Sequence, residues 1–153
     1  MKKIFYSLSS LALLVLSLAG CSRKEIVFDH ENLAFQTSPG KILIEAIMPA
    51  STREADDLYI AGPFAGDSLE VVTEATGKWK LTHSDVVTEK WGIYLDPASF
   101  KGGFTLEDGF FFVNVQQGVE RSVTNEPFYH TLKAEAGSWY NVYVDRWRSY
   151  FDT

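Results

Sequence analysis

The residues that most often carry catalysis are sparse in this chain and poorly arranged for it. The three histidines, His30, His83 and His130, are far apart, and none has a second ligand at a spacing typical of zinc sites. No Gly-x-Ser-x-Gly segment marks a nucleophile. Glu45 is the one acid embedded in an apolar run. We predict a protein that is not an enzyme and needs no cofactor or metal. A small hydrolase that uses Glu45 and a second acid is the least favoured alternative.

Acidic residues also gather in the first half of the chain. Asp56, Asp57 and Asp67 carry carboxylate oxygens, which are the ligands that Ca²⁺ prefers in proteins. A solvated acidic loop explains the same residues without an ion. We favour the solvated loop and predict no metal site.

Aromatic residues are the stronger candidates for contact with a ligand. They make up 14% of the chain and include four tryptophans. An exposed aromatic ring offers an apolar face to the C–H face of a sugar, while neighbouring polar groups bind its hydroxyls. The candidates for such stacking are Trp79, Trp91 and Trp139. The alternative for each of them is packing in the protein core, which is the commoner role of tryptophan in a β-protein.

Short β-like runs, separated by Gly, Pro, Asp and Asn, must position these rings. The segment 57–66 is typical: Leu58 and Ile60 alternate with Tyr59 and Ala61, and Gly62-Pro63 then forms a turn. No segment keeps a period of 3.6 residues over a dozen positions. We count eight or nine short strands among the β-like runs at 26–28, 41–48, 57–61, 71–73, 79–82, 91–95, 110–115, 120–123, 128–132 and 138–147. This pattern predicts an all-β fold, an antiparallel immunoglobulin-like sandwich of about eight strands.

The amino-terminal residues predict export and a lipid anchor. A basic start and a short apolar run precede Leu18-Ala19-Gly20-Cys21, which resembles the lipobox of bacterial lipoproteins. The resemblance implies cleavage before Cys21 and acylation of this residue, the one cysteine of the chain. We therefore expect a signal peptide over residues 1–20, a lipidated tether over 21–30 and a single sandwich domain over 31–153.

Charge and sorting signals limit the partners. Without residues 1–20 the chain has 12 basic against 20 acidic residues and a net charge of −8, which argues against nucleic acid as a partner. The membrane is the expected partner through the lipid on Cys21. Ser22 after the cysteine fits transport to the outer membrane in lipoproteins generally. Both its periplasmic face and the cell surface remain open as locations.

Four segments resemble starch- and glycogen-binding domains and outer-membrane lipoproteins of starch-utilisation systems. They are 58–64 with Gly-Pro-Phe at its end, 91–97, the aromatic 108–114, and 139–144. The resemblance implies an immunoglobulin-like fold and glucan binding, with Asn141 as a sugar contact alongside Trp79 or Trp91. The chain departs from the family pattern, which usually has a tryptophan soon after the Gly-x-Phe motif and a lysine in the aromatic strand.

Two functions from different classes follow. The leading hypothesis is a lipid-anchored, non-catalytic glycan-binding accessory module with Trp79, Trp91, Trp139 and Asn141 as ligand-binding residues. The alternative is an envelope lipoprotein that mediates protein–protein interaction or assembly. In that case the exposed aromatic rings would form an apolar patch for a protein partner.

Overall fold

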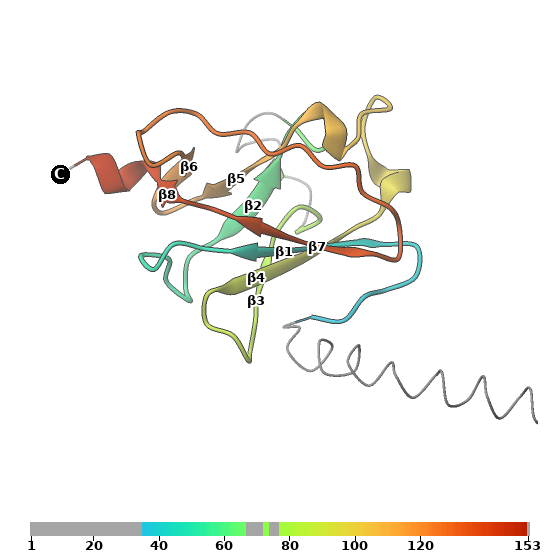
Figure 1. Ribbon diagram of the computed structural model, residues 1–153, viewed down its shortest axis with the longest axis horizontal. Helices are drawn as coiled ribbons and strands as arrows, with labels where there is room; N and C mark the ends of the chain where they lie inside the picture. Colours follow the sequence, from blue (N-terminus) through green and yellow to red (C-terminus); the bar gives the residue numbers. More distant parts are fainter. Residues whose placement is uncertain (1–34, 67–71, 74–76, 153) are drawn as a thin grey trace, which may run out of the picture. The chain divides into compact units, whose positions relative to one another are not determined.

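Two four-stranded sheets pack face to face. The computed structural model describes residues 35–66, 72–73 and 77–152. The predicted signal peptide, Cys21, the tether and the strand expected at 26–28 lie outside these residues. The first sheet has the order β3 (Thr82–His83), β4 (Lys90–Leu95), β1 (Ile42–Ile47) and β7 (Trp139–Tyr143), and the second has the order β2 (Leu58–Ala61), β5 (Phe111–Asn114), β6 (Gly118–Arg121) and β8 (Arg146–Trp147) (Figure 1). The predicted all-β sandwich of about eight strands is confirmed.

Single turns of 3-10 helix connect or end some of the strands. They are η1 (Pro97–Ser99), η2 (Leu106–Asp108) and η3 (Arg148–Phe151). In η1 the Asp96 side chain accepts a hydrogen bond from the Ala98 amide. Among the described residues no helix is long and apolar enough to cross a membrane.

Alternation along the strands decides which side chains form the core. On β1, Ile42, Ile44 and Ala46 face the second sheet and are almost completely buried. The largest fully buried side chains of the core are those of Trp79, Trp147, Phe64, Phe110 and Phe112. Removing one such large apolar side chain from water stabilises the fold by about 1.5–3 kcal/mol.

The pairing of β1 with β7 corrects the prediction of an antiparallel sandwich. These two strands run parallel, whereas the other pairs of described strands are antiparallel. Period-two alternation reports which face of a strand is apolar but not the direction of its neighbour. Because β1 and β7 come from opposite ends of the domain, no hairpin restricts them to antiparallel pairing.

The long strand predicted at 138–147 is two strands. β7 ends at Tyr143 in the first sheet, and β8 begins at Arg146 in the second sheet. The chain therefore crosses between the layers, and Trp147 becomes part of the core on arrival. Alternation continues through both strands, so the sequence pattern alone does not reveal the break.

Three other predicted strands are shorter than expected or missing. The segment 128–132 forms one isolated bridge, between His130 and Phe110. In the segment 79–82, Lys80 bridges to Tyr59 before β3 begins. In the segment 71–73, the two described residues have helical backbone geometry. Helical, turn or irregular backbone takes the place of regular strand pairing in these segments, although their composition is β-like.

The turn after β2 generates a prediction about stability. Gly62 has φ +152°, and a Cβ atom there would lie 2.6 Å from the carbonyl oxygen of Gly109. Because that neighbour is backbone, we expect Gly62→Ala to lower the free energy of unfolding by about 2–4 kcal/mol. Gly103→Ala is the matched control, since Gly103 has φ +73° but open space around the new methyl group. We expect Gly103→Ala to lower the free energy of unfolding by about 1 kcal/mol. Urea denaturation measures both, and equal losses would contradict the steric explanation.

Candidate functional site

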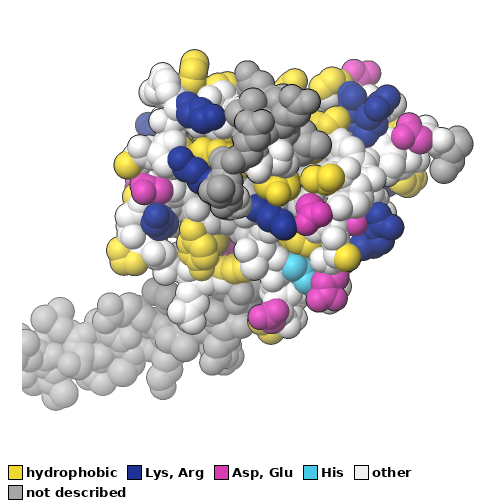
Figure 2. Space-filling model, turned by 180° about the vertical axis from the view of Figure 1, so that it is seen from behind, with side chains coloured by type: hydrophobic (Ala, Val, Ile, Leu, Met, Phe, Trp, Pro, Cys, Tyr) yellow, Lys and Arg dark blue, Asp and Glu magenta, His cyan; other side chains and the backbone are white. Residues whose placement is uncertain are grey.

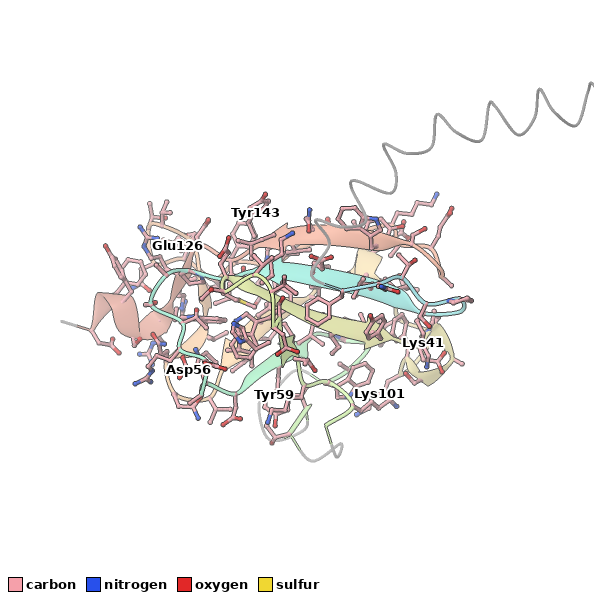
Figure 3. The ribbon with its side chains drawn as sticks, turned by 90° about the horizontal axis from the view of Figure 1, so that it is seen from below. Lys41, Asp56, Tyr59, Lys101, Glu126 and Tyr143 are labelled. Atoms are coloured by element: carbon pink, nitrogen blue, oxygen red, sulfur yellow. The ribbon has the colours of Figure 1, made fainter. Side chains whose placement is uncertain are left out.

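Three outward-facing side chains on β7 form the most distinctive surface feature. Trp139, Asn141 and Tyr143 alternate with core-facing Tyr140 and Val142. The Trp139 side chain is 37% exposed, and that of Tyr143 is 65% exposed. Consecutive members are about 7 Å apart along the strand. We call these three residues the β7 row. Figure 3 shows Tyr143 on the β7 side of the sandwich, with Tyr59 on the other side.

The rest of the outer face of the first sheet is less open. A Cβ atom on Gly92 would lie 2.6 Å from the ring of Phe35, so this ring occupies the space that the glycine leaves. The Tyr94 hydroxyl donates a hydrogen bond to the Gln36 carbonyl oxygen at 2.6 Å. The chain at Phe35 and Gln36 therefore lies against β4. β7 lies at the edge of the sheet, separated from β4 by β1, and its outward-facing side chains are exposed.

A buried ion pair lies beside the β7 row. Glu45 on β1 is in register with Asn141 on β7. Its carboxylate is fully buried and lies 3.3 Å from the Lys90 ammonium group, and neither carboxylate oxygen has a hydrogen-bond partner in the described part of the chain. The predicted acid is thus paired with a lysine.

A groove runs along the open edge of β7. It has a volume of about 470 Å³ and lies between Asn141–Asp145 on one side and 128–132 on the other. Phe128 and Tyr129 are exposed on the second wall, at 37% and 64%. We call this feature the lateral groove. It shares Asn141 and Tyr143 with the β7 row.

A carboxylate–imidazole pair forms part of the structure beneath the groove. Glu120 Oε2 lies 2.5 Å from His130 Nε2, and Glu120 Oε1 accepts a hydrogen bond from the Phe112 amide at 3.0 Å. The imidazole ring packs against Phe110 and Phe128. Burial raises the pKa of the Glu120 carboxyl group, and the hydrogen bond with His130 opposes part of that rise.

Two of the four predicted ligand-binding residues lie in the core. Trp79 is 1% exposed and packs edge-on against Phe64, and Trp91 is 4% exposed and packs against His83. Neither presents a ring face to a ligand in this structure, so we assign both to packing and correct their expected role. Trp91 points inward because it shares the core face of β4 with Ile93 and Leu95. Trp79 lies in the turn that precedes β3, and its ring packs into the core from there. Composition alone reveals neither placement.

The other two predicted residues, Trp139 and Asn141, lie in the β7 row. The prediction missed Tyr143, although its position two residues after Asn141 places it on the same face of a strand. It also missed the other wall of the groove. No sequence signal connects that wall to β7, because tertiary structure brings them together.

The acidic loop is held by hydrogen bonds. The Asp56 carboxylate accepts hydrogen bonds from the side chains of Asn114 and Gln117, at 2.9 and 2.7 Å. Asp57 pairs with Lys80 at 3.0 Å. Asp67 lies outside the described residues. Within the described ranges no group of three or more His, Cys, Asp or Glu residues could hold a metal ion.

Comparisons with protein-family models, with curated proteins and with solved structures find no match for this chain. The function therefore has to follow from the side chains themselves. In the β7 row and the lateral groove, exposed aromatic rings and polar groups come together.

The buried pair generates a prediction of pH dependence. The folded pKa of Glu120 lies above its ordinary value of 4.5. Its contribution to stability is therefore complete below that value and is lost as the pH rises through the folded pKa. Glutamine does not ionise, so the Glu120→Gln variant should not lose stability in this way. As the pH rises above 4.5, we expect the free energy of unfolding to fall less in this variant than in the wild type. Urea titrations at a series of pH values measure the difference. The exposed Glu126→Gln is the control, and parallel pH profiles for all three proteins would contradict the prediction.

Proposed function

We propose that this protein is a lipid-anchored, non-catalytic glycan-binding module of the bacterial outer membrane. The observation that carries the proposal is the β7 row, in which an exposed tryptophan and an exposed tyrosine flank an exposed asparagine on one strand face. A rigid strand holds all three side chains, so little conformational entropy is lost when a ligand binds.

The chemistry of the row suits a sugar chain. The ring faces of Trp139 and Tyr143 can stack against the C–H faces of two sugar rings about 14 Å apart along the strand. Asn141 between them has an amide that both donates and accepts hydrogen bonds, as sugar hydroxyls require. This combination favours an extended, uncharged glycan over a compact anionic ligand.

The resemblance to starch- and glycogen-binding domains supports the same proposal. It implies Asn141 as a sugar contact, and this residue lies between the two exposed rings. We propose that the sandwich is of the immunoglobulin-like type found in that family. The proposal departs from the expected site by using Tyr143 in place of Trp79 and Trp91, which are buried.

The surface charge is compatible with an uncharged ligand. Figure 2 shows acidic and basic side chains interspersed on one face of the described residues. The whole chain has a net charge of −6. Such a surface offers no electrostatic attraction for nucleic acid or for an anionic polymer. Binding through stacking and hydrogen bonds does not depend on net charge.

A fluorescence titration tests the glycan proposal. Trp139 is the exposed tryptophan, while Trp79, Trp91 and Trp147 are at most 4% exposed. We expect a saturable change in tryptophan emission with malto-oligosaccharides or another member of a panel of neutral glycans. Trp139→Ala should abolish the change, and Asn141→Ala should weaken binding about tenfold through the loss of its hydrogen bonds.

Tyr150→Ala is the control for that titration, because Tyr150 is 56% exposed outside the β7 row. It should bind like the wild type. A flat response of the folded wild-type protein to the whole panel, also seen as no retardation in affinity electrophoresis, would overturn the glycan proposal. It would favour the alternative of an envelope protein partner.

The lipid anchor is tested separately. We expect metabolic labelling with a fatty-acid analogue to label the wild-type protein and to place it in the outer-membrane fraction. Cys21→Ser should remove the label and the membrane association, because the thiol is the site of acylation. Replacement of Ser22 by Ala is the matched control and should keep the label. An unlabelled wild-type protein in the soluble fraction would contradict the anchor.

A further inference from the structure

Along one edge of the first sheet, backbone groups have no hydrogen-bond partner in the described part of the chain. Along β7 the hydrogen bonds to β1 alternate: the Leu43 amide donates to the Ser138 carbonyl at 3.0 Å, and the Val144 amide donates to the Ile47 carbonyl at 2.9 Å. In this parallel ladder the even-numbered residues of β7 bond to β1. The amide and carbonyl groups of Trp139, Asn141 and Tyr143 therefore point away from β1. They have no hydrogen-bond partner among the described residues.

The free edge faces open space. The lateral groove lies alongside Asn141–Asp145. On its other wall, His130 uses both of its backbone groups to bond Phe110, at 2.9 and 2.7 Å. The exposed rings of Phe128 and Tyr129 flank this bridge. The edge of β7 and a neighbouring apolar surface are thus accessible together from one side of the sandwich.

The edge also lacks the features that usually prevent strand pairing. Exposed edge strands commonly carry lysine, proline or a bulge, which block the approach of another strand. Residues 136–144 contain no charged residue and no proline, in a chain whose net charge is −6. An uncharged strand in an acidic protein is the place where two copies of the chain can approach with the least electrostatic repulsion.

We propose that β7 pairs antiparallel with β7 of a second copy, about a two-fold axis at Asn141. In this register Asn141 lies opposite the partner's Asn141, and Trp139 lies opposite the partner's Tyr143. All of these residues have outward-pointing backbone groups, so each opposed pair forms two backbone hydrogen bonds at a Cα separation of about 5.5 Å.

The outward-facing side chains of β7 have the same order of types in both chain directions. Ring, amide and ring alternate with inward-facing residues, so the reversed strand places a ring opposite a ring and an amide opposite an amide. Cross-strand aromatic pairs stabilise a sheet, and two asparagine amides can donate and accept between them. The pairing joins the two first sheets and puts two β7 rows side by side on one face. It goes beyond glycan binding and does not depend on it.

Sedimentation equilibrium tests the register through residue 141. The sample for this experiment is the chain from Ser22 onward, so that acyl chains do not cause association. Both sheets lie within the compact unit Ala34–Thr153 and are therefore kept. We expect a reversible monomer–dimer equilibrium. Asn141→Lys and Asn141→Glu should each raise the dimer Kd about fivefold or more, because each puts like charges directly opposite one another. An equimolar mixture of the two variants should recover the dimer, because opposite charges then meet at the axis.

A proline variant separates the backbone from the side chain. The backbone N–H of Asn141 makes no hydrogen bond to β1. Asn141→Pro therefore leaves the hydrogen bonds between β1 and β7 within the monomer intact. It should raise the dimer Kd about 30-fold by removing two intermolecular hydrogen bonds. Asn141→Ala keeps the amide and should still form the dimer, although it loses the glycan contact. This difference separates failure of the dimer from failure of the glycan proposal.

A wild-type protein that stays monomeric up to millimolar concentration overturns the proposal. The proposal is also overturned if Asn141→Lys, Asn141→Glu and Asn141→Pro all dimerise as the wild type does, because another surface must then hold the two copies together. Amide exchange measured by NMR covers the case in which variants fail to fold. In the wild type, the amides of Asn141 and Tyr143 should become protected only at concentrations that form the dimer. Exchange of both amides at open-chain rates in the dimer would refute β7 pairing.

Discussion

The parallel pairing of β7 with β1 is the interaction on which the rest of the structure depends. β1 lies inside the first sheet, between β4 and β7, and its even-numbered residues form much of the core. The register with β7 puts Tyr140 and Val142 on the same inner face. It thereby turns Trp139, Asn141 and Tyr143 outward. One set of hydrogen bonds thus decides both the packing of the last strand and the composition of the exposed surface.

Three of the four tryptophans pack in the core. Trp79, Trp91 and Trp147 are buried, and together with the phenylalanines around Phe110 they fill the space between two sheets of short strands. Short strands bury little area each, so large side chains supply much of the apolar surface that a domain of this size needs. Exposed rings remain at β7 and at the wall of the lateral groove, and also at Tyr94, Phe104 and Tyr150.

Buried charge is paired on both sides of the β7 strand. Glu45 lies beside Lys90 on the outer face of the first sheet, and Glu120 bonds His130 below the lateral groove. A buried carboxylate is costly unless a partner compensates for lost water. Glu45, the one acid that the sequence embeds in an apolar run, has such a partner in Lys90. The β7 row itself consists of two aromatic side chains and one amide and contains no charged group.

The sequence by itself determined the all-β class, the approximate number of strands and the turn at Gly62, because alternation, glycine and proline act locally. It also placed Trp139 and Asn141 on one strand face. Only the tertiary structure decided that Trp79 and Trp91 are core residues, since burial depends on which sheet covers a face. The parallel direction of β7, the break before β8 and the groove beside β7 were likewise decided there, because they depend on contacts between segments far apart in the chain.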